Sequence, residues 1–93
     1  MKDKLRVAMV DDEPLAIETN HIIIKEHCPG VEVIWWAAGI DSALEQIKAN
    51  PPEVLLLDVE LSNGTGFDLL NRLDRIDFQV VFITAYDKYA IRA

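Results

Sequence analysis

Three aspartates and a threonine each follow or close an apolar run, and they are the residues of this sequence best suited to chemistry. Asp11 and Asp12 follow LRVAMV, Asp58 follows VLLL, and Thr84 closes QVVFIT. Carboxylates brought close together repel one another and raise each other's proton affinity. A hard divalent cation relieves that repulsion, and oxygen ligands favour Mg²⁺ or Mn²⁺. A carboxylate placed beside a cation and a hydroxyl suits phosphoryl transfer, in which it would act as the nucleophile.

Short apolar runs predict the strands that would position these residues. Runs of this kind, bounded by turn signals, are typical of strands buried on both faces of a sheet. They occupy residues 5–10, 31–37, 54–61 and 79–84. Helical patterns occupy residues 15–28, 40–50, 67–74 and the segment from 86 onwards. This alternation predicts an α/β fold, a doubly wound parallel sheet with right-handed crossovers. The carboxyl ends of its strands form a ligand edge, where the three aspartates and the threonine would meet.

Side-chain patterns predict how some of these elements are capped and which faces they bury. Ser42 and Glu45 have the spacing of a capping box at the start of the second helix. Trp35 and Trp36 point to opposite faces of a strand, so one should pack inward, and Glu32 in the same run indicates an edge strand. The apolar stripe expected on the second helix comprises Ile40, Ala43, Leu44 and Ile47. The face expected on the third helix comprises Phe67, Leu70 and Leu73.

Composition restricts the class of protein. The chain of 93 residues is predicted to be one small domain, residues 1–93, and 51% of its residues are hydrophobic. Its net charge of −7 argues against direct contact with nucleic acid and suits a cation or a basic partner. The lone cysteine, Cys28, fits a reducing cytoplasm, and no signal peptide or membrane span is expected. His21 and His27 are interpreted as surface or boundary residues because no second ligand stands at helical spacing.

Three motifs taken together resemble the receiver domain of bacterial two-component response regulators. They are MVDDEP, LLLDVEL with NGTGFDLL after it, and VVFITAYDKYA, and they follow one another at the right spacing along the whole chain. The second and third motifs are most similar to regulators that carry a LytTR-type DNA-binding domain downstream. The resemblance implies a flavodoxin-like receiver fold with strand order 2-1-3-4.

The resemblance implies a role for each acid of the predicted site. Asp58 matches the phosphoacceptor, Asp12 matches the acid that binds Mg²⁺ directly, and Asp11 matches the acid that acts mostly through water. The main-chain carbonyl of Glu60 matches the third protein ligand of the metal, for which Mn²⁺ is an alternative to Mg²⁺. The metal site is therefore expected to comprise Asp11, Asp12, Asp58 and Glu60.

The resemblance also implies a switch at the end of the fourth strand. Thr84 matches the hydroxyl that turns toward the phosphoryl group, and Ala85 matches a small residue that leaves room for phosphoryl access. The side chains of Glu60 and Tyr86 fall where members of this family tune loss of the phosphate to water. Phosphorylation would shift a pre-existing two-state equilibrium and change the surface near the fourth helix.

Two departures from the family pattern concern a loop and the C-terminal part of the domain. Ser62 stands where the loop usually has a proline. The family's fifth strand, which ends in a lysine, and its last helix are missing, and Lys88 does not match that lysine. The domain is therefore expected to be C-terminally incomplete. Residues 80–84 would then form an open, apolar strand edge, and a homodimer is expected through that edge or through the surface of the fourth helix.

The sequence thus predicts a phosphorylation-dependent signalling domain in the cytoplasm, without enzymatic turnover. Its partners would be a sensor histidine kinase and a downstream effector domain, expected to be a DNA-binding output that regulates transcription. Two alternatives stay open. A phosphatase with an aspartate nucleophile usually has a second acid two residues later, where Glu60 stands. The second alternative is an interaction module with an inactive site, in which Asp58 merely ends a strand.

Overall fold

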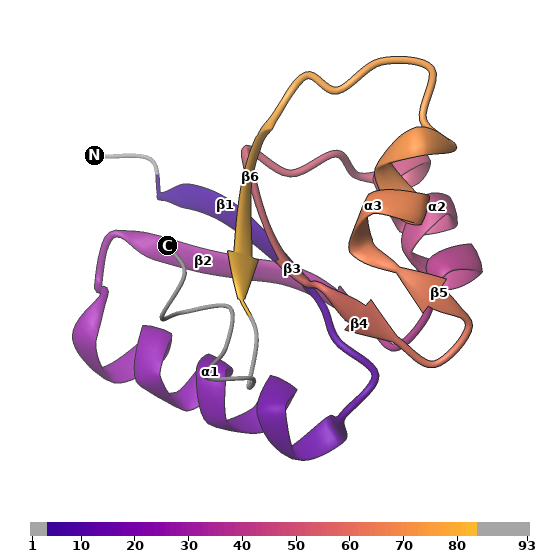
Figure 1. The fold of residues 1–93 in the computed structure, drawn as a ribbon. Coiled ribbons are helices and arrows are strands. Elements are labelled where there is room, and N and C mark those ends of the chain that lie inside the picture. The colour runs from indigo at the N-terminus through magenta and orange to yellow at the C-terminus, as the bar shows by residue number, and fades with distance from the viewer. Residues whose placement is uncertain (1–3, 84–93) are drawn as a thin grey trace.

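A four-stranded parallel sheet forms the centre of the computed structural model, which describes residues 4–83 (Figure 1). The strand order is β2-β1-β3-β6. The elements are β1 (Leu5–Val10), α1 (Pro14–His27), β2 (Val31–Ala37), α2 (Ile40–Ala49), β3 (Val54–Asp58), β4 (Glu60–Leu61), β5 (Gly64–Thr65), α3 (Gly66–Asn71) and β6 (Gln79–Ile83). Helix α1 lies on one face of the sheet, and α2 and α3 lie on the other. The predicted α/β fold and strand order 2-1-3-4 are confirmed, because β6 is the fourth strand of the sheet.

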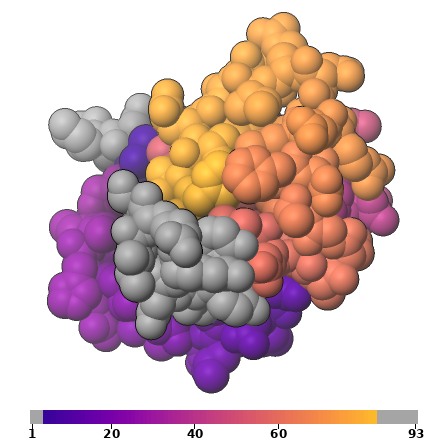
Figure 2. Space-filling model, in the orientation of Figure 1, coloured from indigo at the N-terminus to yellow at the C-terminus, as the bar shows by residue number. Residues whose placement is uncertain are grey.

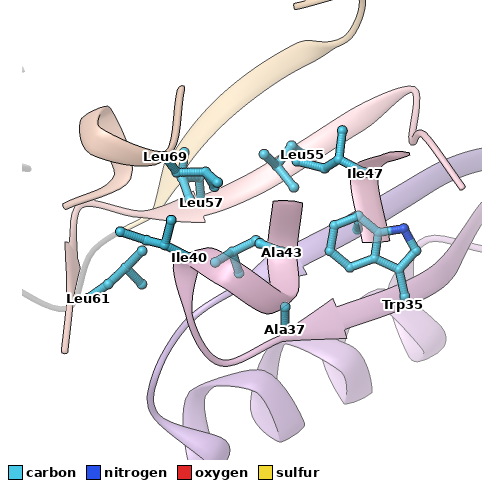
Figure 3. Packing of buried hydrophobic residues seen from close by; sticks show 11 residues of the cluster. Trp35, Ala37, Ile40, Ala43, Ile47, Leu55, Leu57, Leu61 and Leu69 are labelled. Atoms are coloured by element: carbon cyan, nitrogen blue, oxygen red, sulfur yellow. The ribbon is translucent and has the colours of Figure 1, made fainter. Parts of the chain in front are cut away.

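The core lies between the sheet and the α2–α3 layer (Figure 3). Alternate residues of β1, β2 and β3 meet α2 and α3 there, as expected for strands with a two-residue side-chain period. The buried members are Ala8, Val10, Trp35, Ala37, Ile40, Ala43, Ile47, Leu55, Leu57, Leu61 and Leu69. The predicted stripe of α2 is confirmed, since Ile40, Ala43 and Ile47 are buried and Leu44 packs against them.

The edge strand β2 contains both tryptophans and a break in register. Trp35 is buried, and its Nε1 donates a hydrogen bond to the carbonyl of Asn50 at 2.8 Å, whereas Trp36 is 55% exposed. The prediction of opposite faces is therefore confirmed, as is the edge position. Val33 pairs with Val7 and Trp35 pairs with Ala8, so Ile34 has no partner in β1. This β-bulge lets the strand keep Trp35 in the core.

The predicted capping box at Ser42 and Glu45 is wrong. Helix α2 begins at Ile40 with Gly39 as its N-cap, and no side chain caps it. Ser42 already lies in the first turn, where its hydroxyl donates to the Gly39 carbonyl at 3.3 Å. Helix α3 does have a capping box.

The region after β3 differs most from the prediction. The predicted strand 54–61 ends at Asp58, and a two-stranded hairpin of β4 and β5 follows it. In α3 the fully buried residue is Leu69, whereas Phe67 is 53% exposed and contacts Phe82 with ring centroids 4.7 Å apart. The predicted face is only partly confirmed, since Leu70 and Leu73 pack against the core. The hairpin was not predicted because two-residue strands carry no periodic pattern.

Strand β6 lies at the edge of the described sheet and pairs with β3. Within residues 4–83 no strand pairs with its other side. Val81 is 46% exposed and Phe82 is 39% exposed. The atoms of β6 and α3 adjoin on one face of the molecule (Figure 2). The expected homodimer through this strand stays a prediction, and its alternative surface, the fourth helix, lies outside the described residues.

Candidate functional site

The three aspartates come together at the carboxyl ends of the two central strands. Asp11 and Asp12 follow β1, and Asp58 is the last residue of β3. Val10 pairs with Leu57 in the neighbouring strand, so the chain leaves both strands at the same level. One carboxylate oxygen from each aspartate lies within 4.8 Å of the others. The parallel topology thus builds an acidic cluster from residues that are far apart in the sequence.

Backbone hydrogen bonds hold the acids in place. The amide of Asp11 donates to the Ala37 carbonyl at 3.1 Å, which ties the end of β1 to the end of β2. The amide of Glu13 donates to the Asp11 carboxylate at 2.9 Å, and the amide of Glu60 donates to the Asp58 carboxylate at 3.4 Å. These side chains are therefore oriented by the turns that follow their own strands.

Burial raises the pKa of both Asp11 and Asp58 above the ordinary aspartate value of 3.8. Partial burial is the largest cause for each carboxyl, because desolvation disfavours the charged form. The negative charge of Asp11 also raises the pKa of Asp58, and the charge of Asp12 raises both, while hydrogen bonds from the backbone amides of Glu13 and Glu60 act in the opposite direction. The cluster therefore carries electrostatic strain that a cation would relieve.

The acids line a hollow of about 400 Å³ that is open enough to admit a small anion together with a hydrated cation. Its lining residues are Asp11, Asp12, Glu13, Ala16, Asp58, Glu60 and Leu61. Carboxylate oxygen atoms are the ligands that Mg²⁺ and Mn²⁺ prefer, and Mg²⁺ commonly keeps several waters. The residues present fit a divalent cation.

Glycine at position 66 lets α3 begin directly against the acidic edge. A Cβ atom there would lie 2.6 Å from the carbonyl oxygen of Asp58 and 2.9 Å from Leu57. The amide of Gly66 donates to the Val59 carbonyl at 2.8 Å. Thr65 caps the helix, with its Oγ1 accepting from the amide of Asp68 at 3.1 Å. The backbone on which Asp58 stands is thus supported by the start of α3.

The structure brings together all the predicted acids, but it does not describe every predicted residue. Asp11, Asp12, Asp58 and Glu60 line one hollow. Thr84, Ala85 and Tyr86 lie outside the described residues. The last described strand residue, Ile83, pairs with Asp58. Sequence reasoning did not single out Ala16 or Leu61 as lining residues, and neither carries a signal that would have identified it.

This fold and this edge define a class of protein, a parallel α/β domain with an acidic, cation-competent site at the ends of its central strands. The response regulator receiver domain family matches residues 7–93. The chain belongs to this family. The predicted resemblance is therefore confirmed.

Characterised relatives and solved structures agree with this assignment. The sensory transduction proteins LytT of Bacillus subtilis and Bacillus anthracis are 41% and 38% identical to the chain over 91 residues. The transcriptional regulatory protein BtsR of Salmonella typhi is 33% identical over 90 residues. Each match covers 96% of this chain and 37% of the relative. The chain thus spans about a third of the length of these relatives.

Among solved structures, the signal receiver domain of NarL from Mycobacterium tuberculosis is similar with a TM-score of 0.80 and 33% identity. That match covers 96% of this chain and 73% of the NarL domain. The receiver domain of PhyR from Erythrobacter litoralis is similar with a TM-score of 0.78 and 26% identity, over 96% of this chain and 69% of that domain. In the part of the chain that the structure describes, no helix is long and apolar enough to cross a membrane.

Proposed function

We propose that the chain accepts a phosphoryl group on Asp58 from a sensor histidine kinase and thereby controls a downstream output domain. The observation that carries the proposal is the meeting of Asp11, Asp12 and Asp58 within 4.8 Å at the sheet edge of a receiver-domain family member. The similarity to the transcriptional regulatory protein BtsR supports a transcriptional output. In this proposal that output is a LytTR-type DNA-binding domain outside this chain. The domain itself makes no contact with nucleic acid in this proposal, and it acts in the cytoplasm.

In the proposed reaction, a carboxylate oxygen of Asp58 attacks the phosphorus atom of a phosphohistidine. A P–O bond forms, the P–N bond breaks, and the histidine nitrogen keeps the electron pair and takes up a proton. Asp12 and Asp11 would hold Mg²⁺ or Mn²⁺, Asp12 directly and Asp11 mostly through water, together with the Glu60 carbonyl. The bound cation would offset charge on the transferring group. Thr84 would bind a phosphoryl oxygen, and Ala85 would leave room for it.

The raised pKa of Asp58 links cation binding to nucleophilicity. Burial and neighbouring acids favour the protonated carboxyl, which is a poor nucleophile. A cation held by Asp11 and Asp12 reverses that effect, because an opposite charge nearby favours the ionised form. Metal binding would therefore lower the pKa of Asp58 and favour the ionised carboxylate that accepts the phosphoryl group in this proposal.

The test is phosphorylation of the full-length protein with acetyl phosphate and Mg²⁺, followed by mass spectrometry. One phosphoryl group should be added, and it should be lost in base and kept in acid, as expected for an acyl phosphate. Asp58→Asn should abolish the adduct, and Asp74→Asn, an exposed aspartate outside the site, should leave it unchanged. Asp12→Asn should raise the Mg²⁺ concentration needed. Labelling that persists in Asp58→Asn would contradict the proposal.

A phosphatase is the second candidate, and one observation favours it. Glu60 lines the same hollow as Asp58, at the spacing of a general acid two residues after a nucleophile. Hydrolysis of p-nitrophenyl phosphate separates the two functions. We expect no turnover beyond a single phosphoryl group per chain, and sustained turnover that Glu60→Gln abolishes would favour the phosphatase instead.

A further inference from the structure

A second hollow lies between α1 and β2 and is separate from the acidic hollow except at one residue. Its volume is about 360 Å³, at the low end of the range for small-molecule sites. Helix α1 lies alongside β2 and contacts it (Figure 1). Its apolar lining residues are Pro14, Ile17 and Ala38. Asp11 is the lining residue that it shares with the acidic hollow.

Two rings form the wall of this α1–β2 groove. The indole of Trp36 is 55% exposed, and the imidazole of His21 lies against it with ring centroids 6.0 Å apart and planes tilted by 52°. Packing does not explain the exposure of Trp36, because the core uses Trp35 instead. An exposed indole face attracts cations, with Trp the strongest of the aromatic side chains.

Two acids, Asp11 and Glu18, also line this groove. Within residues 4–83 neither acid forms an ion pair, since the two described salt bridges join Arg72 to Asp41 and Arg75 to Asp77. The nearest cation along the helix is Lys25, which borders a neighbouring hollow with Glu18 but lies beyond ion-pair distance. The groove therefore combines apolar and aromatic side chains with two carboxylates that form no ion pair within residues 4–83.

We propose that the α1–β2 groove binds a small organic cation with a flat apolar body, of the arylalkyl ammonium class. The ring of the ligand would cover Ile17 and stack against Trp36, and its ammonium group would lie between Asp11 and Glu18. The volume is sufficient for a ligand of this size. Because Asp11 also belongs to the acidic cluster, the ligand and a divalent cation would each weaken the binding of the other, to the same extent.

The inference does not depend on phosphorylation of Asp58, so the two proposals can fail separately. It is tested with 2-phenylethylammonium in ¹H–¹⁵N NMR titrations of the metal-free protein. Saturable shifts are expected at the indole N–H of Trp36 and at the amides of Ile17, Glu18 and His21. Phenylacetate, which has the same ring and the opposite charge, should give no saturable shift. Saturating Mg²⁺ should raise the dissociation constant of the amine at least threefold.

Two variants and one matched control sharpen the test. Glu18→Gln should raise the dissociation constant of the amine at least threefold. Glu26→Gln, on the same helix but outside the groove, should leave that constant unchanged. Trp36→Leu should weaken binding of the amine more than Glu18→Gln does. Both groove residues are exposed, so the variants should keep the wild-type spectrum elsewhere. The proposal is overturned by no saturable shift, by equal binding of phenylacetate, by shifts confined to the acidic cluster, or by equal affinities of Glu18→Gln and Glu26→Gln.

Discussion

Replacing Gly66 by alanine tests the close contact between α3 and the strand end that carries Asp58. The new Cβ would lie 2.6 Å from the Asp58 carbonyl oxygen and 2.9 Å from a carbon of Leu57. Favourable contacts between such atoms begin at about 3.5 Å, so α3 or β3 must move by roughly 0.5–1 Å. The first partner is backbone and cannot rotate away. The clash must therefore be relieved by displacement of a whole element.

The expected magnitude follows from two opposing effects. Extra atoms forced into a packed site cost about 1–3 kcal/mol. Alanine is better than glycine in a helix by at most about 1 kcal/mol. We therefore expect Gly66→Ala to lower the free energy of unfolding by about 1–2 kcal/mol. For a domain of this size, that lowers the melting temperature by roughly 4–16 °C. Displacement of the Asp58 backbone should also weaken binding of Mg²⁺.

Urea unfolding followed by tryptophan fluorescence measures the change, and Gly30→Ala is the matched control. A Cβ at Gly30 would meet nothing within 4 Å, so this variant should be neutral or slightly more stable, by up to about 1 kcal/mol. If Gly66→Ala unfolds at the same urea concentration as the wild type, or the two variants behave alike, the contact does not constrain the site and the reasoning is refuted.

Three further predictions concern charge, capping and packing. The native state keeps the proton on Asp58 to a higher pH than the unfolded chain does, so the stability of the metal-free protein should fall as the pH rises through the raised pKa. Asp58→Asn should therefore be more stable than the wild type in urea at neutral pH, with no advantage below the ordinary pKa of 3.8. Thr65→Ala should cost about 0.5–2 kcal/mol in thermal unfolding, and Ser42→Ala, which removes no cap, should cost clearly less. Trp35→Ala should cost about 3–5 kcal/mol and Trp36→Ala less than half of that, measured by urea unfolding, because only Trp35 is buried.

The sheet and the acidic cluster could be predicted because buried parallel strands leave a strong signal. Each central strand reads as an unbroken apolar run, and the chain order β-α-β requires the carboxyl ends to share one edge. The three aspartates therefore had to be neighbours once the strands were recognised. The 4.8 Å separation and the raised pKa of Asp58 needed coordinates, since they depend on how far the turn after each strand buries its acid.

The segment after Asp58 was harder to predict because its structure is local and irregular. Strands of two residues show no periodicity, so residues 60–61 were assigned to the strand predicted over 54–61 and their pairing with β5 was not predicted. The capping box was present in the sequence as Thr65 and Asp68, with aspartate where glutamate is more usual. Leu69, and not Phe67, is the buried residue of α3. The reason is that the start of the helix lies directly against the end of β3 at Gly66.

The bulge in β2 bears on how this chain tolerates changes in length. Ile34 has no partner in β1, so a chain that lacked it would pair Val33 and Trp35 with consecutive residues of β1, as they pair now. No other side chain would change its face. The central pairing of β1 with β3 runs in unbroken register from Val7 to Val10, and losing a residue there would turn part of the core outward. Natural variation by one residue should therefore be absorbed at the edge strand and rejected at the centre.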